Sequence, residues 1–192
     1  MRKKTDNPVA KKKIMDAAQE LMIRKGFGAT SLEDICKKAG LTKGSFFHYF
    51  KGKEDLGKAV LHRFCCSSRK TIEECCSTGK TMGPLERIYG YIDSVIDSAA
   101  DKGGAQGCLL GSFATELSDT HPQIRDICHE GFEEWAKLIK KDLKEARSRH
   151  SIRGDVDIEG LADHIIAVAE GSQILARAKK DRKVIKRNMV HL

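Results

Sequence analysis

The 192-residue chain has few prolines and aromatic residues and no long apolar run. It contains three prolines and only 11 Phe, Tyr and Trp residues in total. No apolar run approaches the roughly 18 residues that a membrane-spanning helix needs, and the opening MRKKTDNPVAKKK lacks the apolar segment of a signal peptide. We therefore expect a cytoplasmic protein with no membrane partner. Strict alternation of apolar and polar residues is also missing, and this favours an all-α fold.

The seven cysteines include no C-x-x-C pair. Two vicinal pairs, Cys65-Cys66 and Cys75-Cys76, would lie on one helix, where neighbouring side chains point roughly 100° apart. This arrangement does not build a four-cysteine zinc site, so no metal and no other cofactor is expected. The chain also lacks G-x-S-x-G, a phosphate-binding glycine loop and H-E-x-x-H. An enzyme is therefore not predicted.

The net charge of +8 is concentrated in the first quarter of the chain. Residues 1–53 contain 13 Lys and Arg against 5 Asp and Glu, whereas residues 54–192 contain 22 of each kind. A basic module attached to a neutral body is typical of a protein that binds a polyanion. We therefore divide the chain into an N-terminal domain, residues 1–53, and a body, residues 54–192.

The basic part has the pattern of a helix-turn-helix. An amphipathic helix is predicted over residues 9–25 and ends at Gly26. A second helix begins in TSLEDICKKAG, with Thr30 or Ser31 as its N-cap, and ends at Gly40. A third begins at Thr42 in LTKGSFFHYF. Two short capped helices behind a longer one are typical of a DNA-binding helix-turn-helix.

Four of the eleven aromatic residues lie in this third helix, and a helical wheel divides them between two faces. At 100° per residue, Phe46 and Phe50 share the face toward the core, with Phe47 beside them and Tyr49 on a flank. The opposite, outward face is where a recognition helix would meet the major groove. Its residues are Thr42, Lys43, Gly44, Ser45 and His48.

The body is predicted to be a bundle of helices. Helical periodicity and breaks at Gly and Pro suggest helices over about 54–76, 85–103, 108–121, 122–150 and 158–180, and a further helix in the tail from residue 181. No strand pattern interrupts them.

The sequence resembles the tetracycline-repressor (TetR) family of bacterial transcription regulators. The likeness rests on KKIMDAAQELMIRKGFGATSLEDICKKAGLTKGSFFHYFKGKEDLGKAV, which meets nearly every position of the family's N-terminal pattern. A weaker likeness in GCLLGSFATELSDTHPQIR is to a ligand-domain segment of a branch that includes electrophile- and drug-responsive repressors. The resemblance implies a dimer that binds double-stranded DNA at a palindromic operator and is released by a small-molecule effector.

The resemblance also implies roles for residues of the basic domain. Base edges or nearby phosphates would be contacted by Thr42, Lys43, Ser45 and His48, and Gly44 would allow close approach to the groove. Phosphates would be contacted by Tyr49, by Lys53 and by backbone near Thr30. The family usually has tyrosine where this chain has Phe47, so that side chain either contacts DNA or fills the core.

In the body, the resemblance implies an effector pocket and a dimer interface. The candidate pocket residues could equally be ordinary bundle core, and the effector would be small and apolar or electrophilic. They are Ile88, Tyr91, Ile92, Cys108, Leu109, Phe113, Phe132, Trp135 and Ile139. The candidate interface stripe could equally be core within one protomer. It consists of Leu161, Ile165, Val168, Ser172 and Leu175.

Cys108 offers an alternative kind of signal. It lies near the predicted N-terminus of a helix, where the helix dipole can lower the pKa of a thiol. A lowered pKa would make Cys108 a sensor of electrophiles or oxidants, and its covalent modification would then release DNA. The other interpretation is that a small residue packs at this position.

Overall fold

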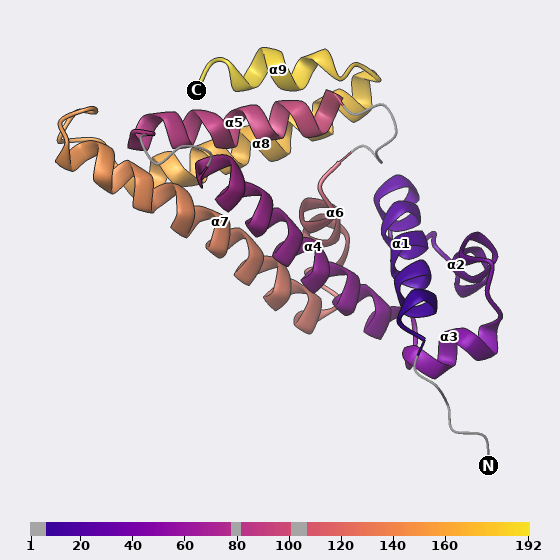
Figure 1. Ribbon diagram of the computed structural model, residues 1–192. Coiled ribbons are helices and arrows are strands. Elements are labelled where there is room, and N and C mark those ends of the chain that lie inside the picture. Colours follow the sequence, from indigo (N-terminus) through magenta and orange to yellow (C-terminus); the bar gives the residue numbers. More distant parts are fainter. Residues whose placement is uncertain (1–6, 78–81, 101–106) are drawn as a thin grey trace.

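The computed structural model describes residues 7–77, 82–100 and 107–192, and every regular element in these ranges is a helix (Figure 1). This confirms the all-α prediction. The helices are α1 (Pro8–Lys25), α2 (Leu32–Ala39), α3 (Lys43–Tyr49), α4 (Lys53–Ser77), α5 (Pro84–Ala100), α6 (Leu109–Leu117), α7 (Pro122–Ser148), α8 (Ile158–Lys179) and α9 (Lys183–Met189). The end predicted at residue 103 lies outside the described residues.

Local capping sets the boundaries of the short N-terminal helices. Ser31 and Asp34 form a reciprocal capping box at the start of α2, and Gly40 ends this helix in the left-handed conformation at φ 65°. Thr42 caps α3, because its hydroxyl accepts a hydrogen bond from the Ser45 N–H at 3.2 Å. Of the alternatives in the sequence, Ser31 and not Thr30 is the N-cap.

Helices α1, α2 and α3 pack together at one end of the molecule around Ile14, Ile35 and Phe46 (Figure 1). The long helix α4 leaves this module and continues into the body. Lys53, which the sequence assigns to the end of the N-terminal domain, is the first residue of α4. The domain division after residue 53 therefore cuts at the start of a helix shared by the two parts.

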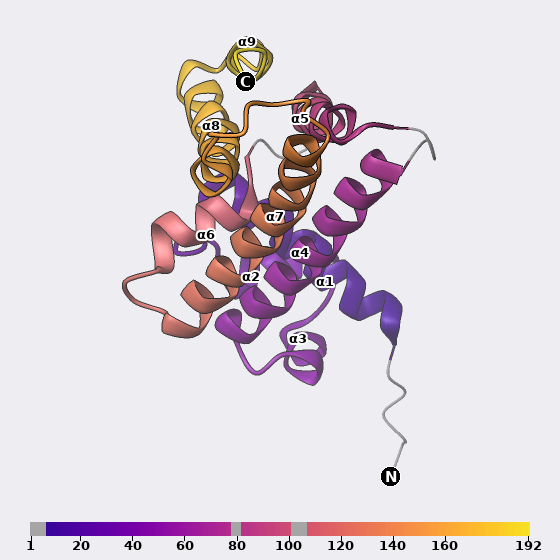
Figure 2. The same cartoon turned by 90° about the vertical axis from the view of Figure 1, so that its left-hand side faces the viewer.

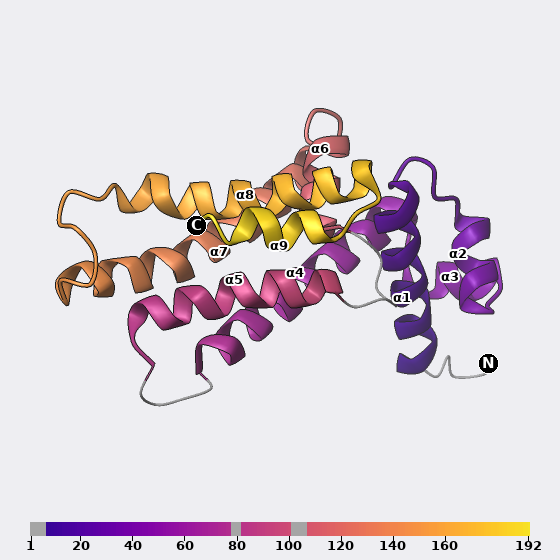
Figure 3. The same cartoon turned by 90° about the horizontal axis from the view of Figure 1, so that it is seen from above.

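In the body, α7 occupies the centre and contacts α4, α5, α6 and α8 (Figure 2). Helix α9 lies across α5 and α8 (Figure 3). Among the described residues, no helix combines the length and the apolar character that a bilayer crossing requires.

A largely buried ion pair joins α5 to α7. The Arg87 guanidinium donates from Nε to Asp142 Oδ1 at 2.8 Å, and it also contacts Glu145. A third donor of the same group reaches the carbonyl oxygen of Met82 at 3.0 Å. Because these partners satisfy the charges, the pair is tolerated in the interior, but the loss of one partner would leave a buried charge.

Replacing Asp142 should therefore be costly. We expect Asp142→Ala to lower the free energy of unfolding by roughly 3 kcal/mol, because Arg87 loses its more buried acidic partner at a mostly buried position and keeps only Glu145. Urea denaturation followed by circular dichroism measures the change. Asp126→Ala on the same helix removes an exposed pair with Arg125 and should cost no more than about 1 kcal/mol. Equal losses for the two variants would contradict the assignment.

Candidate nucleic-acid interface and effector cavity

Helix α3 exposes the predicted recognition face and buries the opposite one. Phe46 and Phe50 are buried at 1% and 4% exposure, as the helical wheel predicts. The residues of the outward face are exposed or half-buried. These residues are Thr42, Lys43, Gly44, Ser45 and His48. Their contacts with DNA stay a prediction, but every one of them keeps some exposure to solvent.

Phe47 belongs to the outer surface. Its side chain is 55% exposed, and only the edge of its ring contacts Phe46, with the ring centroids 5.3 Å apart. The interpretation of Phe47 as core filling is therefore wrong. An exposed aromatic ring on a recognition helix can contact a thymine methyl group or the sugar backbone, but it has no hydroxyl to donate to a phosphate.

Two predicted phosphate contacts face inward. Thr30 is wholly buried, and its hydroxyl donates to the Gly26 carbonyl oxygen at 2.7 Å, so contact at this position is left to the neighbouring backbone. Lys53 extends its ammonium to the carbonyl oxygens of Phe27 and Gly28, at 3.0 and 3.3 Å. In this conformation Lys53 caps a turn, so its phosphate contact stays a prediction and would require an exchange of partner.

Tyr49 also has a partner within the protein. Its hydroxyl donates to the Asn7 carbonyl oxygen and accepts from the Asn7 N–H, each at 3.1 Å. Asn7 is the N-cap of α1, because its side chain accepts from the backbone N–H groups that open this helix. Tyr49 therefore ties the end of α3 to the start of α1, and its predicted phosphate contact would require an exchange of partner.

Sequence patterns did not reveal a joint between the N-terminal module and the body. The turn between α1 and α2 presents backbone groups that no helix satisfies. Glu116 of α6 accepts from the N–H groups of Phe27 and Gly28, at 2.8 and 2.6 Å. Arg177 of α8 donates to the carbonyl oxygens of Ile23 and Arg24 at the end of α1. With Lys53, these side chains form what we call the turn clamp.

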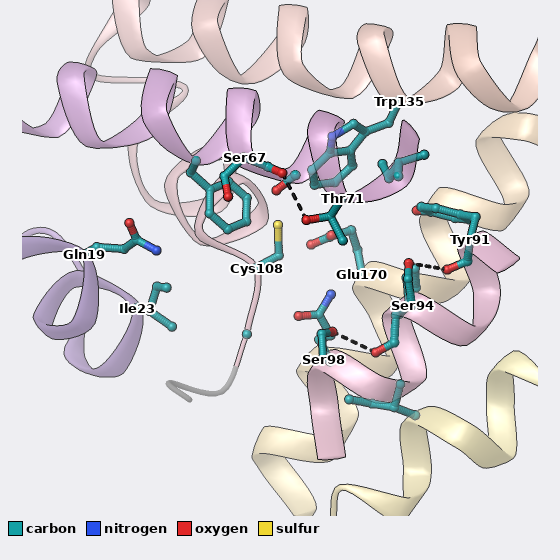
Figure 4. Close-up of a pocket in the computed structure, with 18 of the residues that line it drawn as sticks. Gln19, Ile23, Ser67, Thr71, Tyr91, Ser94, Ser98, Cys108, Trp135 and Glu170 are labelled. Carbon is teal, nitrogen blue, oxygen red and sulfur yellow. Dashed lines mark hydrogen bonds between the residues drawn. The ribbon is translucent and has the colours of Figure 1, made fainter. Parts of the chain in front are cut away.

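A cavity of about 700 Å³ lies between α1 of the N-terminal module and the body (Figure 4). It is bounded by α1, α4, α5, α7, α8, α9 and the chain before α6. Of the nine predicted effector residues, Tyr91, Cys108 and Trp135 line it. The other six do not line the cavity and pack in the core, fully or in part. They are Ile88, Ile92, Leu109, Phe113, Phe132 and Ile139.

The lining residues that sequence reasoning missed are mostly polar. Most come from α1, α4, α5 and α8, and Figure 4 shows several of them around one space with Cys108. Apolar periodicity does not mark such positions, because polar residues on a helix usually face solvent. They include Ser67, Thr71, Ser94, Ser98, Glu170 and Gln173.

The electrostatics around Cys108 are the opposite of the prediction. Burial raises the pKa of the Cys108 thiol well above its ordinary value, and the neighbouring Glu170 carboxylate raises it further. Hydrogen bonds from the backbone at Gly111 and Leu110, in the first turn of α6, act in the other direction but are outweighed. The expectation of a lowered thiol pKa is therefore wrong.

Part of the predicted dimer stripe on α8 belongs to the core of the protomer, and the rest stays a prediction. Ile165 and Ser172 are buried within the protomer, whereas Leu161 and Val168 are half-buried and Leu175 is exposed. Helical periodicity identified residues that share a face, but most of that face packs against neighbouring helices. The exposed large apolar side chains in this region are Ile174 and Leu175 on α8 and Val190, the residue that follows α9.

Two segments of the chain match known protein families. Residues 14–60 match the family described as bacterial regulatory proteins, tetR family, and residues 84–192 match the tetracyclin repressor-like C-terminal domain. A similar protein is the transcriptional repressor DhaR of Mycobacterium sp. strain GP1, 28% identical over 88% of this chain and 83% of that protein.

Solved structures have the same fold. The reduced form of E. coli NemR is 24% identical, with a TM-score of 0.83 over 95% of this chain and 94% of that one. A TetR transcriptional regulator from Chloroflexus aurantiacus is 26% identical, with a TM-score of 0.86 over 95% and 91% of the two chains.

The turn clamp can be tested without any ligand. Replacing Glu116 with Gln removes the charge from two hydrogen bonds, a loss of about 1–2 kcal/mol at this joint. Hydrogen exchange should become faster at the amides of Phe27 and Gly28. Asp119→Asn, just beyond the end of α6, serves as the matched control and should leave both amides unchanged. Unaltered exchange in Glu116→Gln would show that the clamp does not hold the turn.

Proposed function

The chain belongs to the TetR family of bacterial transcription regulators, and from this premise we propose that it is a homodimeric repressor with no catalytic role, released from a palindromic DNA site when a small molecule occupies the cavity. Its relative DhaR carries the name of a repressor, which supports this direction of control. A two-fold dimer would place its recognition helices about 34–36 Å apart, one in each half-site.

One observation carries the proposal: each helix that supplies a clamp residue also reaches the cavity. Helix α4 places Ser67 and Thr71 in the lining and Lys53 at the turn. Helix α8 does the same with Glu170 and Arg177. Helix α6 begins beside the cavity and carries Glu116. A ligand that shifts any of these helices would therefore also shift the N-terminal module.

The dimer is proposed to form through the outer faces of α8 and α9. Ile174, Leu175 and Val190 are exposed there although they are large and apolar. Burial of such side chains between two copies would stabilise a two-fold interface. The ligand would then act by favouring a separation of the two modules that does not match the DNA, which requires several kcal/mol of preference between the two states.

Covalent modification of Cys108 is the second candidate. It is favoured because the cysteine lines the cavity and because a solved relative is described in a reduced form. The buried thiol with its raised pKa argues against it, since the thiolate is the reactive species. Reversible binding is therefore the function that the geometry supports better.

DNA binding should depend on salt and on Lys43. A palindrome selected from random duplexes should bind with a log–log salt slope near 0.9 per phosphate contact. Lys43→Ala should reduce the preference for this palindrome over random DNA by about tenfold, because a base contact is lost. Fluorescence anisotropy measures both affinities.

Lys144→Ala, on α7 of the body, is the matched control. A flat salt response or equal affinity for both duplexes would refute the proposal.

Alkylation separates the two candidate signals. N-ethylmaleimide should react first with the exposed Cys66 and only slowly with Cys108. The wild type and Cys108→Ser should therefore keep the same DNA affinity after a short treatment, and Cys66→Ser serves as the control for modification outside the cavity. Release of the wild type alone, with Cys108→Ser retained on DNA, would instead establish covalent sensing.

A further inference from the structure

Three hydroxyl groups of the cavity present acceptors rather than donors. Thr71 donates its hydroxyl hydrogen to the Ser67 carbonyl oxygen at 3.1 Å. Ser94 and Ser98 donate in the same way to the carbonyl oxygens of Tyr91 and Val95, at 2.7 and 2.8 Å (Figure 4). Because each hydroxyl has one hydrogen, the remaining lone pairs of these three oxygens are available to a donor from a ligand.

Glu170 adds a carboxyl group without a cationic partner. It is largely buried on α8 and lies beside Cys108. Within the described part of the chain, no salt bridge joins it to a lysine or arginine. The other acids of the lining differ in this respect, because Asp16 pairs with Arg63 and Glu20 pairs with Lys38. A buried acid usually has such a partner or stays neutral.

Aromatic side chains complete the wall. Trp135 and Tyr91 line the cavity together with Phe64, whose ring centroid lies 6.4 Å from that of Trp135. Aromatic faces bind apolar bodies and also attract organic cations. The lining thus combines three hydroxyl acceptors, an acid that no salt bridge joins to a cation among the described residues, and an aromatic surface.

We propose that the cavity binds a protonated organic amine with an apolar body, whose N–H groups donate to Glu170 and to the hydroxyl oxygens of Thr71, Ser94 and Ser98. The inference deepens the proposed function and rests on it, because it names the chemical class of the effector. An alcohol of the same shape would satisfy one acceptor but would leave the acid without a cation.

The ionisation of Glu170 makes a second prediction for amine binding, its dependence on pH. Burial raises the pKa of Glu170 to about 7, although a hydrogen bond from the Cys108 thiol acts in the opposite direction. An ammonium group binds the ionised form, so amine affinity should rise as the pH increases from 6 to 8 and Glu170 loses its proton.

The nearest groups with a shifted pKa do not share this behaviour. Burial raises the pKa of the Tyr91 hydroxyl and of the Cys108 thiol, so both stay neutral. Burial also acts to raise the pKa of Asp16, but hydrogen bonds from Lys12 and Arg63 outweigh it and lower that pKa below its ordinary value. We therefore attribute the pH dependence of amine binding to Glu170.

Direct binding to the full-length protein without DNA tests the proposal. The probes are 2-phenylethylamine, 4-phenylbutylamine and 1-adamantylmethylamine, each compared with the alcohol that replaces its amino group. Trp135 is the only tryptophan of the chain and lines the cavity, so its fluorescence reports occupancy, and calorimetry confirms the affinity. At least one amine should bind about tenfold more tightly than its alcohol, as a charge-assisted hydrogen bond implies.

Variants of Glu170 test whether this carboxyl group causes the preference for amines over alcohols. Glu170→Gln should bring the amine and the alcohol to within about threefold of each other, whereas Glu170→Asp should keep part of the difference. Glu20→Gln, at a paired acid of the same lining, should leave it unchanged. Circular dichroism melting checks that each variant is folded. If Glu170→Gln does not fold, the Asp variant and the pH profile of the wild type still decide the matter.

The outcomes are separate from those of the DNA experiments. If no amine binds more tightly than its alcohol, or if Glu170→Gln keeps the full preference while folded, the proposal is overturned. An amine affinity that is constant between pH 6 and 8 also overturns it. None of these results affects DNA binding by the free protein, whereas the absence of DNA binding would overturn the proposed function and leave the amine affinity intact.

Discussion

The orientation of the N-terminal module depends on the backbone of one turn. Gly26 takes a φ of 88°, which ends α1 and turns its last carbonyl groups and the next N–H groups away from any helix. Their partners come from α4, α6 and α8 of the body. The Phe27 ring is held in the same place, with its centroid 5.6 Å from that of Phe113 and 4.5 Å from the Lys53 ammonium. The recognition helix is therefore attached to the body through α1 as well as through α4.

In the proposed mechanism, helices couple this attachment to the cavity. At a rise of about 1.5 Å per residue, Cys108 and Glu116 are about 12 Å apart along α6, and Glu170 and Arg177 about 10 Å apart along α8. Over such lengths a helix moves nearly as a rigid rod, so a displacement at the cavity reaches the turn with little loss. Because the clamp consists of hydrogen bonds with defined directions, a small displacement suffices to weaken it.

Local features were predictable from the sequence, and long-range ones were not. The caps at Ser31 and Thr42 and the division of α3 into two faces follow from neighbouring residues alone. The burial of Thr30, the inward direction of Lys53 and the polar cavity wall depend on contacts with distant segments. The stripe through Ile165 and Ser172 shows the same limit, because periodicity tells which residues share a face but not what covers that face. The dipole argument for Cys108 failed because burial outweighs it.

Part of the positive charge of the N-terminal module is already paired with acidic residues. Lys43 pairs with Glu33, Lys25 with Asp34 and Lys38 with Glu20, so several of its lysines already have acidic partners in the free protein. The pair at Lys43 is exposed on both sides, so solvent and salt weaken it. In the proposed complex Lys43 must leave Glu33 before it can contact a guanine edge, whereas at an unsuitable base it can keep Glu33. The ion pair therefore subtracts from the gain at the correct base, and the discrimination must come from the base contact itself.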